Sequence, residues 1–380
     1  MKQIFISAAA TIVMLLAACS EKERTLEIAF RQEGQIHKET IPLDFLTPTG
    51  EIQTPYIDTV RFSVLDSLSF PGMNPDRMKT YTTPVKLDFS KKIAPCSPEY
   101  YAAYTTHYII KAIEAYNRVF DNKIDFDFEK EYRNIEICFG DFSGITTPKF
   151  YILEKNSHPS PSLFYHEIGH RAFWYIEDEE GLGVKFDGLT VIHMGLLEYF
   201  SLSFNNSPVM GEDCLPQQMS RDARTMLKYP LDDSLKLRRT LELVGLSYPA
   251  EAKNPESNVA KYLAACYATY NSDILDKIYD NHRGGMVLTS TLWRIRETAG
   301  RETTDRLVAQ TILNLNACME ARENWCSNNL LASLKNRIEW CDVFYGLIQQ
   351  DKALNNGKNI PSIVGEFKKT GYPVDLVKVD

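Results

Sequence analysis

The spacing of apolar residues changes along the chain. Between residues 25 and 89 apolar residues come in short runs, the pattern typical of short β-strands, of which residues 26–30 and 60–64 are two. Turn sequences containing Pro and Gly, at residues 47–50 and 70–72, interrupt these runs. This N-terminal part is therefore predicted to be rich in β-strands.

A long amphipathic helix is predicted over residues 98–120. Ser97 and Pro98 form a helix start signal, and an apolar stripe follows at a spacing of four, made by Tyr104, Tyr108, Ala112, Tyr116 and Phe120. Residues 135–139 and 150–153 are predicted strands. A second helix is expected to begin near residues 160–162.

From residue 213 onward the apolar spacing is helical almost throughout. Helices are predicted over residues 216–228, 232–244, 256–270, 286–298, 303–318 and 328–349. The chain has no internal repeat, and residues 353–380 carry no clear pattern. The predicted fold class is α+β, with an N-terminal β-rich region, a mixed sheet beside the long helix, and a mainly helical subdomain.

The N-terminus reads as a signal sequence. Lys2 precedes an apolar run over residues 4–18, which is shorter than the ~20 residues that span a bilayer. The run ends in Leu-Ala-Ala-Cys at residues 16–19, which resembles a bacterial lipobox. We therefore expect removal of residues 1–18, a lipid on Cys19, and a protein tethered in the bacterial cell envelope on its periplasmic or cell-surface side. An uncleaved helical anchor is the alternative.

Composition narrows the class of protein. Hydrophobic residues at 44% and charged residues at 24% are ordinary for a folded protein and exclude a disordered, collagen-like or coiled-coil chain. The net charge of −8 disfavours nucleic acid as the main partner, because phosphate binding needs a cationic surface. Eight cysteines less Cys19 leave an odd number, which cannot all pair within one chain, and none forms a Cys-x-x-Cys zinc motif.

The candidate chemistry concentrates at His166-Glu167-Ile168-Gly169-His170. Residues four apart share one face of a helix, so His166 and His170 can direct two imidazole nitrogens at one metal ion, with Glu167 beside them as a general base. The surrounding helix is apolar, and burying three polar groups without partners costs several kcal/mol. A single catalytic zinc ion is predicted. Histidines without a metal are the alternative.

Glu198 is the best candidate for a third metal ligand. It lies within residues 191–204, a strongly apolar predicted helix, where an isolated carboxylate would be costly to bury. His193 and Asp187 are weaker alternatives. Glu198 could also lie on an exposed strip of its helix.

These motifs resemble the gluzincin metallopeptidases, in particular the thermolysin and fungalysin branches. Residues 101–120 are similar to the long helix before the catalytic sheet of that family. Asn281-His282-Arg283-Gly284-Gly285, followed by Leu292-Trp293, is similar to a segment that carries a transition-state histidine. The resemblance implies a zincin-like catalytic subdomain, a general base at Glu167 and oxyanion stabilisation by His282, with Gly284 and Gly285 letting the backbone turn tightly. Position 202, where the family often has an acidic residue, is Leu.

The sequence thus predicts a lipid-anchored zinc metallopeptidase, with an endopeptidase expected and its sequence preference open. The expected organisation is a signal peptide (1–18), a β-rich region (19–95), a zincin-like subdomain (96–210), a helical subdomain (211–350) and a C-terminal extension (351–380). A peptide or protein substrate is expected to pair with an exposed edge at strand 135–139. The alternative is a non-catalytic zincin-like lipoprotein that binds peptides or glycans.

Overall fold

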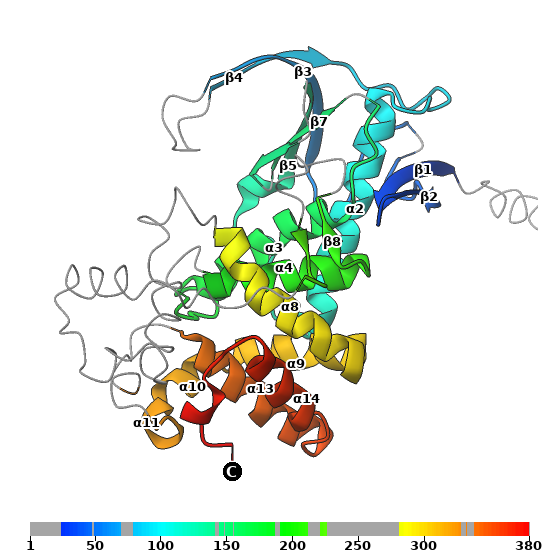
Figure 1. Ribbon diagram of the computed structural model, residues 1–380. Helices are drawn as coiled ribbons and strands as arrows, with labels where there is room; N and C mark the ends of the chain where they lie inside the picture. The colour runs from blue at the N-terminus through cyan, green and yellow to red at the C-terminus, as the bar shows by residue number, and fades with distance from the viewer. Residues whose placement is uncertain are drawn as a thin grey trace, which may run out of the picture.

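The fold is α+β, as predicted from the sequence. The computed structural model describes residues 24–47, 49–69, 79–140, 144–147, 149–154, 156–186, 191–211, 221–225, 281–327, 332 and 338–379. The predicted signal peptide, Cys19 and the predicted helices 232–244 and 256–270 lie outside these residues. The sheet forms one end of the molecule and the C-terminal helices the other, with three central helices between them (Figure 1).

A five-stranded mixed sheet follows the predicted β-rich pattern. Its order is β4-β3-β5-β7-β6, with β3, β5 and β7 parallel and the two outer strands antiparallel to their neighbours. The strands are β3 (Thr59–Ser69), β4 (Lys79–Val85), β5 (Asn134–Gly140), β6 (Gly144–Thr147) and β7 (Phe150–Glu154). The strands predicted at 60–64, 135–139 and 150–153 are confirmed.

The predicted peptide-binding role of residues 135–139 is wrong in its geometry. These residues lie in β5, which pairs with β3 on one side and β7 on the other. Both edges of β5 are therefore occupied by the protein's own backbone, so this strand offers no free edge to an extended peptide.

A separate hairpin packs onto the first long helix. Strands β1 (Thr25–Gln32) and β2 (Gln35–Pro42) pair antiparallel, which confirms the strand predicted at 26–30. Glu39 of β2 accepts hydrogen bonds from Tyr108 Oη at 2.9 Å and Lys111 Nζ at 2.6 Å. Burial, together with the positive charge of Lys111, lowers the pKa of the adjacent His107 to about 4 against the opposing effect of Glu39 and Asp44.

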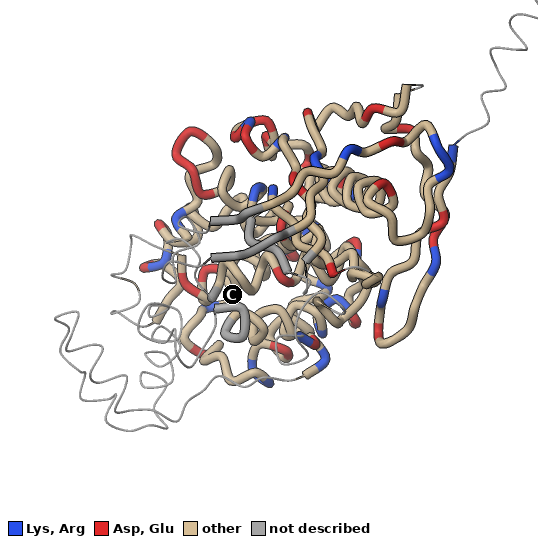
Figure 2. The backbone as a smooth tube through the Cα atoms, turned by 90° about the horizontal axis from the view of Figure 1, so that it is seen from above, with Lys and Arg blue, Asp and Glu red and all other residues tan. Residues whose placement is uncertain are grey.

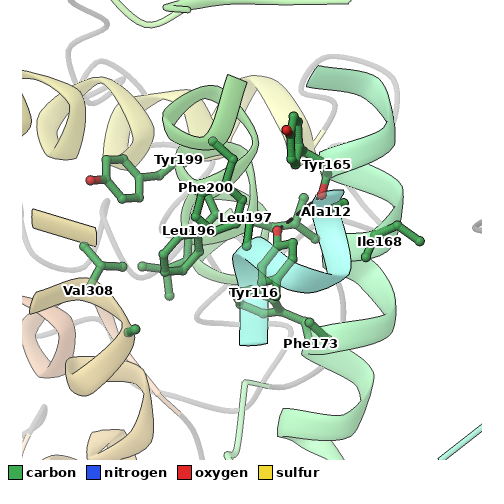
Figure 3. Packing of buried hydrophobic residues seen from close by; sticks show 14 of the residues in the cluster. Ala112, Tyr116, Tyr165, Ile168, Phe173, Leu196, Leu197, Tyr199, Phe200 and Val308 are labelled. Carbon is green, nitrogen blue, oxygen red and sulfur yellow. Dashed lines mark hydrogen bonds between the residues drawn. The ribbon is translucent and has the colours of Figure 1, made fainter. Parts of the chain in front are cut away.

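The helix predicted over residues 98–120 is confirmed as α2 (Pro98–Val119). Ser97 caps it by accepting a hydrogen bond from the Tyr100 backbone N–H at 3.2 Å, and Pro98 occupies the first turn, where its missing N–H costs nothing. Its buried face packs against the central helices: Tyr116 lies among Leu197 and Phe200 of α4 and Ile168 and Phe173 of α3 (Figure 3).

The three central helices are α3 (Ser162–Glu177), α4 (Val191–Asn205) and α8 (Asn281–Ala299). Helices α4 and α8 cross at Gly195 and Gly285, where a Cβ on Gly285 would lie 2.7 Å from the Gly195 backbone nitrogen. Thr289 Oγ1 donates to the carbonyl oxygen of Gly195 at 2.9 Å across this crossing. The expected tight turn at residues 284–285 is therefore wrong, because both glycines lie within α8, and Gly285 permits close helix packing.

The C-terminal region is helical, with corrections to the predicted bounds. Its elements are α9 (Arg301–Leu313), α10 (Leu315–Glu320), α11 (Arg322–Trp325), α13 (Trp340–Asn355), α14 (Ile360–Lys369) and the 3-10 helix η4 (Val374–Leu376). The helix predicted over 303–318 is broken at Asn314, whose side chain donates to the Gln310 carbonyl oxygen at 2.7 Å. Of the helix predicted over 328–349, residues 340–349 are confirmed within α13, which begins with a capping box of Glu339 and Asp342, whereas residues 328–331 and 333–337 lie outside the described residues.

Within the predicted helix 216–228, the described residues 221–225 are not helical. Arg221–Asp222 forms the short strand β9, which pairs with β8 (Val209–Met210). A long-range pairing has overridden the local helical spacing here.

One cluster of buried apolar side chains extends from Ile28 in β1 to Val377 near the C-terminus. It includes Ile363 and Phe367 of α14, so the C-terminal segment that lacked a clear sequence pattern packs into the same core. The predicted domain boundaries stay predictions.

Two further features of the described residues are the distribution of their charges and the apolarity of their helices. Acidic and basic positions are interspersed over the described chain (Figure 2). No described helix combines the length and apolarity that a transmembrane span requires.

Candidate metal centre

The three motif residues lie together on α3. His166 Nε2 lies 3.2 Å from His170 Nε2, and the two rings are nearly perpendicular, at 88°. One potential ligand atom each from His166, Glu167 and His170 lies within 4.8 Å of the others. The one-turn spacing of the histidines places their nitrogens side by side, as the helical period requires.

The local fold holds this helix close to α2. Gly169 faces Tyr116 of α2, and a Cβ at this position would lie 2.3 Å from Tyr116 Oη. Tyr116 in turn donates to the Tyr165 carbonyl oxygen at 3.3 Å. Gly169, between the two histidines, thus allows α3 to approach α2 closely, whereas any larger residue at this position would push the two helices apart.

The nitrogen separation fits zinc. With zinc–nitrogen bonds of ~2.0–2.1 Å and a tetrahedral angle, two coordinating nitrogens lie about 3.3–3.4 Å apart. The observed 3.2 Å between His166 Nε2 and His170 Nε2 is close to this value. A hydrogen bond between the two imidazoles would have a similar length, so the distance agrees with a metal site without identifying the ion.

Glu167 is set in an environment that favours its neutral form. Its side chain is buried beside the two histidines. Burial, together with the negative charge of Glu198, raises its pKa to about 8 against the opposing effect of Arg221. A dication held by the two histidines would oppose this effect and favour the carboxylate. A carboxyl group whose pKa lies near neutral pH is suited to accepting and releasing a proton.

Glu198 lies next to His166 but is not one of the three residues that form this donor set. The side chain is fully buried in α4, and Oε2 lies 3.7 Å from His166 Nδ1, the ring nitrogen that does not face His170. Its other oxygen, Oε1, forms an ion pair with Arg221 Nη1. The exposed-strip alternative for Glu198 is therefore wrong, whereas its role as a ligand stays a prediction.

Arg221 is the functional candidate that sequence reasoning missed. The local apolar spacing predicts a helix around this position, and the sequence accounts for the burial of Glu198 by a metal ion alone. The available signal was the same one that identified Glu198: a carboxylate in an apolar helix needs a cationic partner, which a buried arginine also supplies.

The remaining candidates lie in different surroundings. His193 is buried with its ring centroid 6.0 Å from that of His170, and its Nδ1 pairs with Glu177 Oε1. Asp187 lies outside the described residues. His282 lies in the first turn of α8, but its side chain is also outside them. Leu202 is buried in a small apolar cluster with Met210 and Trp293.

The predicted absence of a cysteine zinc motif leaves the described cysteines apart from the His166, Glu167 and His170 cluster. Five cysteines among the described residues form no disulfide bond: Cys96, Cys138, Cys318, Cys326 and Cys341. One turn after His170, Trp174 stacks on its ring at a centroid distance of 6.0 Å and an angle of 26°. Tyr132 packs against Trp174 at 5.1 Å.

Comparison with protein-family models and with curated protein sequences gives no match in either case. The functional assignment therefore depends on the residues of the site.

Proposed function

We propose that this protein is a zinc-dependent metallopeptidase. The observation that carries the proposal is the pair of imidazole nitrogens 3.2 Å apart with the Glu167 carboxyl group in the same cluster of donor atoms. A structural zinc site has no need of a base and normally closes its fourth coordination position. The adjacent carboxyl group therefore favours a hydrolytic site.

In this proposal His166 and His170 hold one zinc ion, and Glu198 completes the ligand set. When bound, zinc acidifies a coordinated water toward a pKa of ~7 and polarises the scissile carbonyl group. Glu167 accepts a proton from the attacking water and passes it to the leaving amine. The burial of Glu167 strengthens these electrostatic interactions by excluding bulk water.

His282 is proposed to stabilise the oxyanion. Attack on a peptide carbonyl places negative charge on its oxygen, and an imidazole can donate a hydrogen bond to it whether neutral or charged. This assignment depends on the family resemblance, as does the zincin-like description of the α+β fold.

The proposed location follows from the N-terminal sequence. Lipidation at Cys19 would tether the protein to a bacterial envelope membrane, where peptides or proteins outside the cytoplasm are its substrates. Replacing Cys19 with Ala is expected to release the protein from membranes, and metabolic labelling with a fatty acid measures the modification directly.

Metal analysis combined with peptide hydrolysis tests the function. We expect about one zinc per chain in the wild type, lost in His170→Ala, and cleavage of a quenched casein substrate that a chelator abolishes and zinc restores. Glu167→Gln keeps the size of the side chain, so it should retain zinc while turnover falls by several orders of magnitude. Full zinc in His170→Ala, or wild-type turnover in Glu167→Gln, contradicts the assignment.

One observation favours the non-catalytic alternative. Glu198 forms an ion pair with Arg221 and lies near Nδ1 of His166, the nitrogen that does not face His170. The group of donor atoms on α3 therefore consists of His166, Glu167 and His170, without Glu198. A lipoprotein that binds zinc but cleaves nothing across a broad peptide library would favour this second function.

A further inference from the structure

The short hairpin formed by strands β8 and β9 places Arg221 beside α4. Asn206, with φ of 52°, follows the last helical residue and lets the chain reverse. Strands β8 and β9 then pair antiparallel, with Met210 opposite Arg221, and the Ala223 backbone N–H donates to the Pro208 carbonyl oxygen at 2.8 Å. The ladder therefore places Arg221 beside α4, although it lies 23 positions after Glu198 in the chain.

The hairpin is fixed on the central helices by more than this ladder. Its side chains Met210 and Ala223 share a buried apolar cluster with Leu202 of α4 and with Met286 and Trp293 of α8. In addition, the Gly211 backbone N–H donates to Ser162 Oγ at 3.4 Å, at the first residue of α3. The position of Arg221 is thus determined by contacts with all three central helices.

The two charged groups meet in a buried environment. Glu198 is fully buried and Arg221 is only 8% exposed. Arg221 Nη1 donates to Glu198 Oε1 and lies 3.8 Å from Met210 Sδ. Glu198 Oε2 is the oxygen that lies nearer His166, at 3.7 Å from Nδ1. Arg221 thus contacts Glu198 at Oε1, and Glu198 approaches His166 with Oε2.

We propose that Arg221 is a positioning residue that holds Glu198 for metal binding. This inference rests on the proposed function. Hydrogen bonds to a ligating carboxylate set its orientation, and removal of such outer partners typically weakens metal binding by about 10–100-fold. Arg221 also places a positive charge near the metal site, which by itself would weaken binding of a dication. The proposal requires that orientation outweighs this repulsion.

Zinc affinity, measured by competition with a chromogenic chelator, tests the proposal on the full-length protein. We expect Arg221→Met to bind zinc about 10–100-fold more weakly, and Arg221→Lys, which keeps the charge, to recover part of the loss. The matched control is Arg224→Met, three residues further on, where an exposed arginine pairs with Asp222 and Glu33. This control should bind zinc as the wild type does. Unchanged or tighter binding in Arg221→Met overturns the proposal.

A second comparison separates positioning from folding. Because Arg221→Met leaves a carboxylate buried without this cation, the variant can fail to fold. The double variant Glu198→Gln/Arg221→Met removes both charges and is compared with Glu198→Gln alone. If Arg221 acts through Glu198, the second substitution should change zinc affinity less than about threefold, because coupled residues are not additive. A further tenfold loss would show that Arg221 acts independently and would overturn the proposal.

The failures of the two proposals are distinguishable. If His170→Ala loses zinc but Arg221→Met binds it unchanged, only the proposed role of Arg221 is contradicted. If the wild-type protein binds no zinc, both the proposed function and the role of Arg221 are contradicted.

Discussion

Replacing Gly169 with Ala should destabilise the protein, although alanine is the better helix former. The added Cβ would lie 2.3 Å from Tyr116 Oη and 3.1 Å from Leu197 Cγ. Tyr116 cannot swing away easily, because it is fully buried and its ring packs against Phe200 and Phe204 at centroid distances of 5.8 and 5.0 Å. Helices α2 and α3 must therefore separate.

The size of the effect follows from two opposing contributions. Overpacking a rigid core costs about 1–3 kcal/mol, and a contact as short as 2.3 Å belongs in the upper part of that range. Alanine returns up to about 1 kcal/mol through its higher helix propensity. The free energy of unfolding should therefore fall by about 1–2 kcal/mol.

Gly365 provides a matched control. It also lies within a helix, α14, but a Cβ there would meet no atom within 4 Å. Gly365→Ala should raise the free energy of unfolding by up to about 1 kcal/mol, so urea unfolding should separate the two variants by about 2–3 kcal/mol. If Gly169→Ala is as stable as Gly365→Ala, the packing argument for the helix that carries His166 and His170 is refuted.

Three other predictions concern groups away from this contact. Arg322→Met should lower the free energy of unfolding by about 3–5 kcal/mol, because Arg322 and Asp342 form a fully buried ion pair, and chemical unfolding should show a smaller loss in Arg322→Met/Asp342→Leu. The pKa of His107 is about 4 in the folded protein against an ordinary 6.5, so between these values the unfolded chain binds the extra proton and stability falls as pH falls. Urea unfolding at pH 7 and pH 5 should show about 2 kcal/mol of this loss in the wild type and its absence in His107→Gln. His282→Ala should lower turnover by about 10²- to 10³-fold at unchanged zinc content, and unchanged turnover would refute its proposed role.

Local sequence patterns determined the elements that carry the site. The Ser97-Pro98 start signal and the four-residue aromatic spacing predicted α2, and the same reasoning placed His166 and His170 on one face of α3. The apolar surroundings of Glu198 also predicted its burial. These features follow from periodicity and capping, which depend on residues a few positions apart and are therefore readable along the chain.

Tertiary structure decided which groups meet. The two-residue strand that carries Arg221 is too short to have a period, so its pairing with β8 and its contact with Glu198 arise only from packing against the three central helices. Likewise, β5 has the apolar pattern of a buried strand, but only its pairing with both β3 and β7 excludes it as a peptide-binding edge. The spacing of apolar side chains indicates which face of a helix or strand is buried. The elements that pack against that face are determined by contacts between residues far apart in the chain, and such contacts leave no local pattern in the sequence.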